Sequence, residues 1–538
     1  MLLNQKALRK SAIPVCLMAL GLMSFKQPVD NEKKAIAAEM KKSMVDKLLR
    51  PWYPAAIDTL DGGFLSSFSY DFKPVGNQDK MIVTQARHVW SNAKAAEEFP
   101  NIPYYKYGAK HGFEFLKNKM WDKEYGGFYT YVDREGNPKK GGNFAPKEAY
   151  GNSFAIYGLS AYYQVSGDTS ALNLAIKGFM WLEKHSHDPI YKGYYQHMER
   201  NGTPIKRTPN IRTTAETGYK DQNTSIHLME AFNELYTVWP NALVKARLNE
   251  MLYLIRDTIL TPKGYLNLFF QPDWTPVSYR DSSLDVMMKH KELNHVSFGH
   301  DIETAYLMLE ASHTLGIEND TVTLRIGKKM LDHALDNGYD NSVGGFYDEG
   351  YYYKDKPGIT ILEDTKNWWA QAEGMNTLLI MDKYYPKDNH LYFNKFKQMW
   401  TYTKTYLIDS VHGDWYQGGI DKQPKYKMAL KGQIWKGTYH NFRALMNCIQ
   451  SLEPDTIPPS APGNLKIQHI NNSKLLKWNG VKNDNQFVGY NVYLDGKRIW
   501  YTPLTNFTLP DDVKGKSLKI TSVDMHGNES KASKPVIL

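Results

Sequence analysis

Apolar side chains recur at intervals of three and four residues in many segments of the first 450 residues. Clear examples are 85–97 (QARHVWSNAKAAE) and 223–236 (NTSIHLMEAFNELY). This spacing is typical of amphipathic helices that turn one face toward a core. A glycine-aromatic motif separates the helix-like segments and occurs six times. The six copies are Gly62-Gly63-Phe64, Gly126-Gly127-Phe128-Tyr129, Gly193-Tyr194-Tyr195, Gly264-Tyr265, Gly344-Gly345-Phe346-Tyr347 and Gly413-Asp414-Trp415-Tyr416.

The regular spacing of these copies predicts a repeated helical hairpin. The first glycines follow one another at intervals of 64 to 80 residues, which is long enough for two helices. Repeated hairpins stack into one continuous core, either as a superhelix or as a closed ring. Six hairpins close naturally as an all-α (α/α)6 barrel. The alternative is that the motif only marks turns, with glycine supplying a positive φ and the aromatic ring covering a helix end.

The pattern changes near residue 453. Residues 453–462 (EPDTIPPSAP) form a Pro-rich linker, so we expect the barrel to occupy 34–452. From 463 to 538, short alternating segments and the turn pair Asp495-Gly496 predict strands of a small all-β sandwich. This tail resembles a fibronectin type III module. The resemblance depends on Trp478 as the core tryptophan, Tyr490 and Tyr493 on a central strand, and a final hairpin at 524–530 (DMHGNES).

The N-terminus has the pattern of an export signal. Lys6, Arg9 and Lys10 precede an apolar run at 12–25 that is too short to span a bilayer. We therefore predict a signal peptide at 1–27 and a periplasmic or extracellular protein. A lipoprotein anchored at Cys16 is less favoured, because the preceding Ile-Pro-Val lacks the small residues expected before a lipidated cysteine.

Composition excludes several classes of protein. The 538 residues are 42% hydrophobic and 23% charged, as in a soluble globular protein. The net charge of +9 includes the basic N-terminus and leaves no dense Lys/Arg stripe, so we expect no nucleic-acid partner. No later segment approaches 18 uninterrupted apolar residues, so we expect no transmembrane segment after signal removal. Cys448 has no partner for an internal disulfide and is predicted to be a core residue.

The densest polar group lies at 297–303 (SFGHDIE), before a helix expected at 304–314. His300 and Glu303 would share one face, and a nearby carboxylate fixes the tautomer of a neutral imidazole and raises its basicity. The alternative is a helix N-terminal turn in which Asp301 and Glu303 complement the helix dipole. A His-x-x-Glu pair needs further ligands to hold a metal, and none is evident in the sequence. His440, five residues after Trp435, is a second candidate.

Together these segments resemble the acylglucosamine 2-epimerase superfamily, and within it the cellobiose 2-epimerases. The resemblance spans most of 34–450. The matching segments are 61–64 (DGGF), 85–90 (QARHVW), 223–231 (NTSIHLMEA), 298–303 (FGHDIE), 368–373 (WWAQAE) and 435–441 (WKGTYHN).

This resemblance implies an (α/α)6 barrel that acts on an oligosaccharide or disaccharide without a metal or cofactor. His300 and His440 would be the acid and the base, Glu303 would support His300, and Arg87 would hold the developing oxyanion. The residues that would line the sugar site are Asn223, His227, Trp369, Glu373 and Trp435.

The chemistry accounts for these residue types. Epimerisation at C2 of a reducing-end glucose requires ring opening, removal of the C2 proton and its return to the other face of a planar enediolate. Histidines suit both proton transfers because their pKa lies near neutral pH, and arginine can stabilise the enediolate oxygens. Ser225 stands where cellobiose 2-epimerases generally have a histidine. The identity of the disaccharide, of the cellobiose or mannobiose type, therefore stays open.

Three alternatives stay open as well. An aldose-ketose isomerase would protonate the same enediolate at C1. An inverting glycoside hydrolase on this fold would use two carboxylates, and Asp61, Asp348, Asp414 and Glu373 are available. A non-catalytic glycan-binding protein would keep the aromatic residues and lack turnover. The C-terminal module would serve as a spacer or docking element, with glycan or surface contact as a further role.

Overall fold

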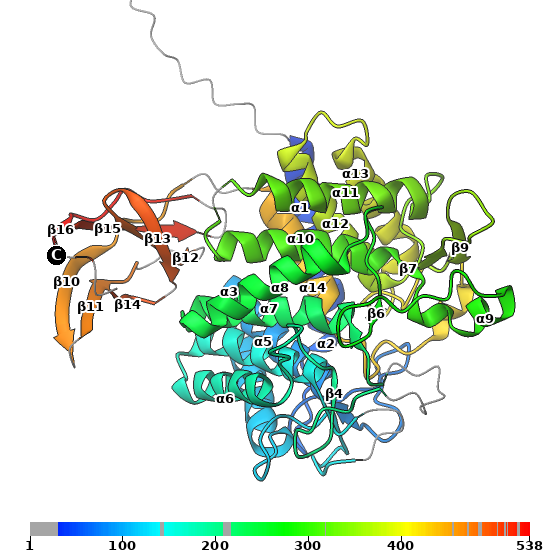
Figure 1. The fold of residues 1–538 in the computed structure, drawn as a ribbon, viewed down its shortest axis with the longest axis horizontal. Coiled ribbons are helices and arrows are strands. Elements are labelled where there is room, and N and C mark those ends of the chain that lie inside the picture. The colour runs from blue at the N-terminus through cyan, green and yellow to red at the C-terminus, as the bar shows by residue number, and fades with distance from the viewer. Residues whose placement is uncertain are drawn as a thin grey trace, which may run out of the picture.

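The computed structural model consists of a large helical part and a small β module at one side (Figure 1). It describes residues 31–139, 145–207, 217–317, 319–453, 457–470, 473–481, 487–502, 504–509, 513, 515–524 and 528–537. The expected signal peptide at 1–27 lies outside the described residues. None of the described helices is both long and apolar enough to cross a membrane.

Six inner helices form a closed ring. Trp90 on the first inner helix packs against Tyr439 and Phe442 on the last, with ring centroids 5.2 and 6.3 Å apart. Inner helices are buried almost all round, because outer helices cover one side and the barrel centre covers the other. The expected helical barrel is confirmed. The inner helices are α3 (Ile82–Glu98), α5 (Ala149–Ser166), α7 (Gln222–Val238), α10 (Phe298–Thr314), α12 (Trp368–Tyr384) and α14 (Tyr439–Leu452).

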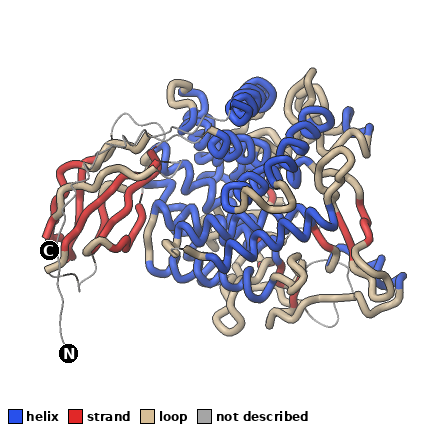
Figure 2. Tube along the Cα trace, turned by 90° about the horizontal axis from the view of Figure 1, so that it is seen from above, coloured by secondary structure: helices blue, strands red, loops and turns tan. Residues whose placement is uncertain are grey.

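Outer helices pack around this ring, so the helical part has two layers. Figure 2 shows its helices between the β module at one end and short strands at the other. The outer helices are α1 (Asn31–Ser43), α4 (Pro103–Phe115), α6 (Thr169–His185), α8 (Ala242–Leu254), α11 (Thr321–Gly338) and α13 (Tyr392–Tyr402). Four of them continue into a π-helical turn, at Met44–Leu49 after α1, Leu116–Met120 after α4, Ile255–Ile259 after α8 and Thr403–Leu407 after α13. Short α2 (Arg50–Trp52) and α9 (Leu284–Lys289) lie in connections.

Short antiparallel strand pairs link the units at one end of the barrel. Two-residue strands directly precede four of the inner helices. The strands of this end are β1 (Lys80–Met81), β2 (Tyr131–Val132), β3 (Lys147–Glu148), β4 (His197–Met198), β5 (Lys220–Asp221), β6 (Phe269–Phe270), β7 (Val296–Ser297), β8 (Glu349–Tyr351) and β9 (Thr360–Glu363). The pairs are β1-β2, β3-β4 and β5-β6, and β7-β8-β9 form a three-stranded sheet.

The glycine-aromatic motif closes the same loop in successive units. In the first unit, the N–H of Asp58 donates to the Gly63 carbonyl and the N–H of Gly62 donates to the Asp58 carbonyl, both at 3.0 Å. Gly63 has a φ of 66°. A Cβ there would lie 2.6 Å from Oε1 of Gln85, so the position requires glycine for space and for conformation. The motif is therefore both a turn device and the mark of a repeat.

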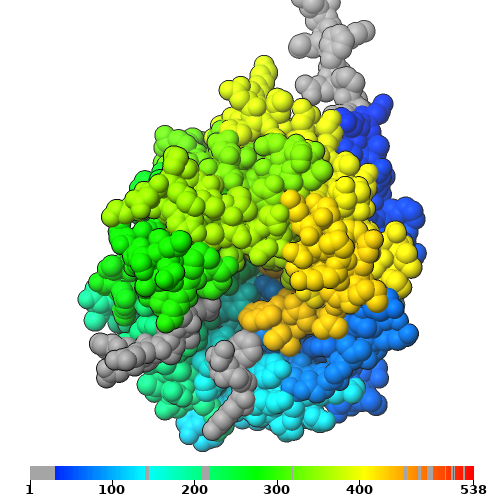
Figure 3. All heavy atoms as spheres, turned by 90° about the vertical axis from the view of Figure 1, so that its right-hand side faces the viewer, coloured from blue at the N-terminus to red at the C-terminus, as the bar shows by residue number. Residues whose placement is uncertain are grey.

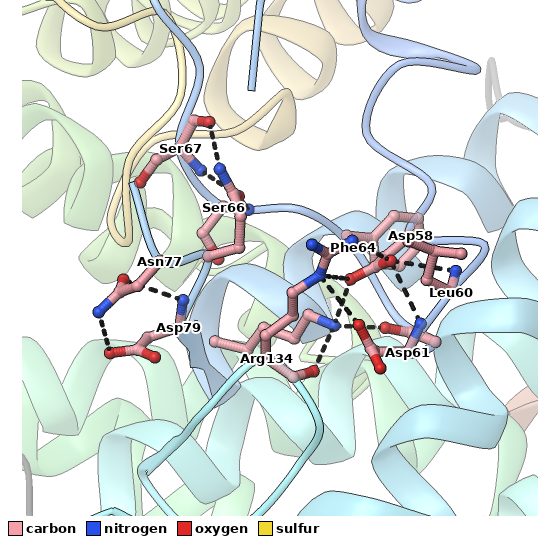
Figure 4. Close-up of polar contacts among 12 residues, drawn as sticks. Asp58, Leu60, Asp61, Phe64, Ser66, Ser67, Asn77, Asp79 and Arg134 are labelled. Atoms are coloured by element: carbon pink, nitrogen blue, oxygen red, sulfur yellow. Dashed lines mark hydrogen bonds and ion pairs between the residues drawn. The ribbon is translucent and has the colours of Figure 1, made fainter. Parts of the chain in front are cut away.

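A buried lysine binds each of these loops except one. Figure 4 shows the first unit, where Asp58 and Asp61 face Arg134. In this unit Nζ of Lys80 donates to Asp58, Gly62 and Arg134 at 2.6 to 3.0 Å. The lysine-aspartate pairs that bind the first residue of these loops are Lys80–Asp58, Lys147–Asp122, Lys220–Asp188, Lys366–Asp340 and Lys431–Asp409, at 2.8 to 3.0 Å.

The fourth unit lacks both members of this pair. Val296 begins β7, where β1, β3 and β5 begin with the lysine, and Thr261 opens the loop where the other units have aspartate. A lone buried charge is much more destabilising than an absent pair, which explains why the two residues change together.

The tail contains two antiparallel sheets that share one core. Leu476, Trp478, Tyr490 and Val492 are buried in it. One sheet contains β10 (Gly463–Ile470), β11 (Ser473–Asn479) and β14 (Asn506–Thr508). The other contains β12 (Phe487–Leu494), β13 (Lys497–Thr502), β15 (Ser517–Asp524) and β16 (Val536–Ile537).

The β module contacts the C-terminal ends of the inner helices. Trp500 on β13 packs edge-on against Tyr236 near the end of α7, with ring centroids 5.2 Å apart. Nζ of Lys245 lies 5.7 Å from the Trp500 ring. The strand pairs lie at the N-terminal ends of the inner helices, so the module occupies the opposite end of the barrel.

The helices extend slightly beyond the predicted segments. α3 and α7 each begin and end within three residues of the predicted limits. α10 begins at Phe298 rather than Thr304, so His300 and Glu303 belong to its first turns. Cys448 is completely buried, as predicted, and has no disulfide.

Candidate active site

The repeat brings distant side chains into one layer. In four units a short strand (β1, β3, β5 or β7) precedes the inner helix, and Lys366 and Lys436 occupy the position of its first residue in the other two units. In every unit, the residue seven positions after this point lies in a common layer of the barrel. These six residues are Arg87, Phe154, His227, Glu303, Glu373 and Arg443. His300 and His440 are both four positions after that point, nearer the strand end. Figure 3 shows that the molecule is hollowed on this side, away from the β module.

His300 is the third residue of α10. Its Nδ1 is 3.0 Å from Oγ of Ser297 and 3.2 Å from Nε2 of Gln222. Its ring centroid is 4.8 Å from that of Trp369. Burial, reinforced by His227, lowers the pKa of His300 to about 3, so the imidazole is neutral at physiological pH.

His440 lies on α14 and is also close to Trp369. The two ring centroids are 5.9 Å apart. Nδ1 of His440 is 2.6 Å from Oε1 of Glu373. Burial, with Arg87 nearby, lowers the pKa of His440 well below its usual value. Two neutral imidazoles therefore lie next to the same indole.

A buried ion cluster lies beneath the histidines. Arg443 donates to Glu303 at 2.5 Å, to Glu373 at 2.7 Å, and also to Glu230. Tyr306 donates to the second oxygen of Glu373 at 2.7 Å. Burial would raise the pKa of Glu230, but Arg443 and His227 hold it at about 2.

The cluster gives two expected site residues partners that the sequence did not indicate. Glu303 binds Arg443, and the described partners of His300 are Gln222 and Ser297, so Glu303 does not support His300 directly. Glu373, expected to line the sugar site, is fully buried and meets Nδ1 of His440. Sequence spacing did not indicate this, because its partners come from other helices.

The structure also assembles a ligand set that the sequence did not suggest. One ligand atom each from Glu303, Glu373 and His440 lies within 4.8 Å of the others. Both carboxylates already accept from Arg443, whose guanidinium supplies the positive charge between them. A metal ion at this point would have to displace that guanidinium.

Arg87 is held by rings rather than by carboxylates. Its guanidinium lies 4.3 Å from the Phe154 ring and 4.9 Å from the Tyr439 ring. It donates to the hydroxyl of Tyr150 at 3.2 Å and to the carbonyl of Trp435 at 3.4 Å. Among the described residues it forms no ion pair, so its charge is available to an anionic group.

Two other expected sugar contacts lie around Tyr150. The rings of His227 and Trp435 are 5.3 and 6.4 Å from it. Nδ1 of His227 is bound to Glu230 at 2.8 Å. Trp435 is 38% exposed, which leaves much of its surface open to a ligand. Oδ1 of Asn223 is buried and finds no hydrogen-bond partner among the described residues.

Ser225 is removed from this group. It is 3% exposed, and its Oγ donates to the Asp221 carbonyl at 2.7 Å. Its place in the repeat matches that of Gln85, Asn152 and Gln371, which hold the glycine loops. Position 225 therefore belongs to the layer of residues that lies next to the glycine-aromatic loops.

The carboxylates that a hydrolase would need are mostly engaged elsewhere. Asp414 is fully buried and bonded to Lys436 and Asn441, and Asp61 pairs with Arg134 at 3.0 Å. Burial raises the pKa of Asp348 to about 7, and its one described hydrogen-bond partner is Asn367 at 2.6 Å. Only one of the four is therefore free to act as an acid.

Sequence reasoning missed Gln222, Tyr150, Ser297 and Arg443. Counting seven positions in every unit would have found Arg443. Gln222 and Tyr150 carry no such signal, because their partners lie on other segments, whereas Ser297 lies only three positions before its partner His300.

Comparison with known proteins agrees with this geometry. Residues 62–444 match the N-acylglucosamine 2-epimerase (GlcNAc 2-epimerase) family. The chain belongs to this family.

Among its relatives, the cellobiose 2-epimerase of Ruminococcus albus is 31% identical over 423 residues, which cover 77% of this chain and 98% of that protein. The cellobiose 2-epimerase of Bacteroides fragilis is 28% identical, with the same coverage. The solved cellobiose 2-epimerase of Spirochaeta thermophila has a TM-score of 0.65 and 26% identity, covering 79% of this chain and 98% of its own. The relatives include cellobiose 2-epimerases and a D-mannose isomerase, and this chain is a carbohydrate epimerase.

Proposed function

We propose that the protein interconverts glucose and mannose at the reducing end of a β-linked disaccharide, by removing and returning the C2 proton. The observation that supports this most directly is that His300 and His440 both lie next to Trp369. Arg87 lies beside them, and among the described residues it has no carboxylate partner. The related cellobiose 2-epimerases support the substrate class.

In this reaction one neutral histidine takes the proton from C2 of the open-chain sugar. The C–H electron pair becomes the C1–C2 double bond, and the carbonyl pair moves to O1. The resulting oxyanion lies where Arg87 can stabilise it in a site with little water. The other histidine, as imidazolium, returns a proton to the opposite face of C2. Before turnover begins, one of the two histidines must therefore carry a second ring proton in addition to the single N–H of a neutral imidazole.

Incubation with cellobiose and with mannobiose in D2O, followed by NMR, tests the proposal. We expect the 2-epimer to appear with deuterium at C2, and His440→Ala to abolish both signals. A ketose product would make the protein an aldose-ketose isomerase. Release of monosaccharides would make it a hydrolase, and no exchange with either sugar would favour a glycan-binding protein.

We also propose that the protein is exported and that its tail is a fibronectin type III-like sandwich. The N-terminal pattern at 1–27 supports export, to the periplasm or the outside of the cell. The two sheets around Trp478 support the sandwich. Because the module contacts the far end of the barrel, we expect it to bind a surface or glycan and not the reacting sugar. Cell fractionation tests export, and glycan binding by the whole chain compared with a chain ending at Glu453 tests the binding role of the module.

A further inference from the structure

The two histidines have opposite hydrogen-bonding environments at Nδ1. Around His300 the neighbours are an amide nitrogen, Nε2 of Gln222, and a hydroxyl, Oγ of Ser297. An amide nitrogen can only donate, so Nδ1 of His300 must accept. The single proton of this neutral imidazole is then on Nε2.

Around His440 the neighbour is a carboxylate. Glu373 also receives hydrogen bonds from Tyr306 and Arg443, and both of these groups donate. Burial raises the pKa of Glu373, but the Arg443 guanidinium and the Tyr306 hydroxyl both stabilise its ionised form, which can only accept from His440. The proton of neutral His440 is therefore on Nδ1, and Nε2 keeps its lone pair.

We propose that Gln222, with Ser297, is a positioning residue that holds His300 in the Nε2–H tautomer, whereas Glu373 holds His440 in the opposite tautomer. The two imidazoles then present unlike atoms to the ligand. His440 presents a lone pair and is the base that starts the reaction, while His300 presents an N–H donor. The tautomers are a property of the unliganded protein, and only their consequence for turnover rests on the proposed function.

This arrangement makes the protonation of His300 the sensitive step. If neutral His300 gave its Nε2 proton to carbon, it would become an imidazolate, so transfer requires a second proton on Nδ1. Gln222 opposes that proton, because its amide nitrogen can only donate toward Nδ1, whereas the Ser297 hydroxyl can turn to accept it. Burial acts in the same direction by lowering the pKa of His300. Gln222 is 3% exposed, and its Oε1 is buried without a partner among the described residues, so little solvent can substitute for it.

Gln222→Glu changes this donor into an acceptor with almost no change in shape. A carboxylate facing Nδ1 stabilises a proton there, and a charge at this range shifts a pKa by about 1–3 units. We expect the alkaline limb of the pH dependence of kcat/KM to move up by about 1–3 pH units. Gln164→Glu is the matched control, because it adds the same charge on α5 roughly 20 Å along the helix from Tyr150.

The direct test uses the full chain with 15N-labelled histidine. Two-bond 15N–1H spectra report which ring nitrogen carries the proton, and His300→Asn and His440→Asn identify the signals. We expect a protonated Nε2 in His300, a protonated Nδ1 in His440, and a proton on Nδ1 of His300 in Gln222→Glu. A protonated Nδ1 in wild-type His300, or an unchanged spectrum in Gln222→Glu, would overturn the inference.

This spectrum does not depend on turnover. If the tautomers are as expected but no disaccharide exchanges its C2 hydrogen, the proposed function fails and the tautomer assignment stands. If exchange occurs and His300 carries its proton on Nδ1, the reverse holds.

Discussion

The buried pair Lys220–Asp188 allows the energetics of the repeat to be tested quantitatively. Nζ of Lys220 lies 2.8 Å from Asp188 and 2.8 Å from the carbonyls of Lys192 and Pro272. Lys220 is fully buried and Asp188 is 3% exposed. Lys220→Met keeps the volume of the side chain and removes the charge, so it leaves a buried carboxylate without its cation.

The expected cost is about 3–5 kcal/mol, the usual effect of breaking a buried ion pair from one side. The titration of Asp188 gives an independent figure. Burial would raise its pKa, but Lys220 and the loop N–H groups lower it from 3.8 to about 2. This shift corresponds to about 2–3 kcal/mol of stability at neutral pH. For a barrel of this size, roughly 1 kcal/mol lowers Tm by about 1 °C, so we expect a decrease of about 3–5 °C.

The pH dependence separates this explanation from simple loss of packing. Because the folded pKa of Asp188 is depressed, its contribution is complete above about pH 4 and is lost as pH falls toward 2. In Lys220→Met the carboxyl can become neutral, so the deficit relative to wild type should shrink between pH 7 and pH 4.

Calorimetry of wild type, Lys220→Met, Asp188→Asn and the double variant provides the assay. The double variant should be clearly less destabilised than the sum of the singles, as the joint replacement by Val296 and Thr261 in the fourth unit suggests. Additive effects that are also the same at pH 4 and pH 7 would refute the reasoning.

Three further predictions concern the site and the module. Arg87→Lys should lower kcat about 100-fold or more while KM changes less, since a point charge replaces the planar guanidinium at the oxyanion; equal losses in binding and turnover would contradict this role. Glu373→Gln should lower kcat by a similar factor with unchanged circular dichroism, because His440 loses the acceptor that orients it; a variant with full turnover would exclude that role. A chain ending at Glu453 should keep its kcat and lose a few degrees in Tm, because Trp500 covers Tyr236 at the far end of the barrel; lost turnover with an intact Tm would place the module at the site.

Much of the fold followed from local pattern. Helical periodicity and the six glycine motifs predicted hairpins of two helices, because the space beside Gly63 and its positive φ are local demands. The turn at Asp495-Gly496 is likewise local, since both residues adopt positive φ, at 49° and 82°. The start of α10 was misplaced, because the residues of its first turns are polar and serve the site.

The candidate site followed only in part. The family motifs pointed to His300, His440 and Arg87, and the structure brings them to one end of the barrel. Their catalytic roles remain predictions, which the substitutions above will test. The partners of Glu303 and Glu373 were not foreseen, because spacing within one helix cannot reveal a partner on another.

The sequence by itself determined the repeat, the boundary near 453 and the residue types of the chemistry, since each depends on neighbours along the chain. Only the tertiary structure decided which group each histidine meets. Gln222 is 78 positions from His300, and Glu373 is 67 positions from His440. Closing the ring of six helices brings these pairs within hydrogen-bonding distance. A proton on a buried imidazole goes to whichever nitrogen has an acceptor, so the tautomers are set by packing across helices.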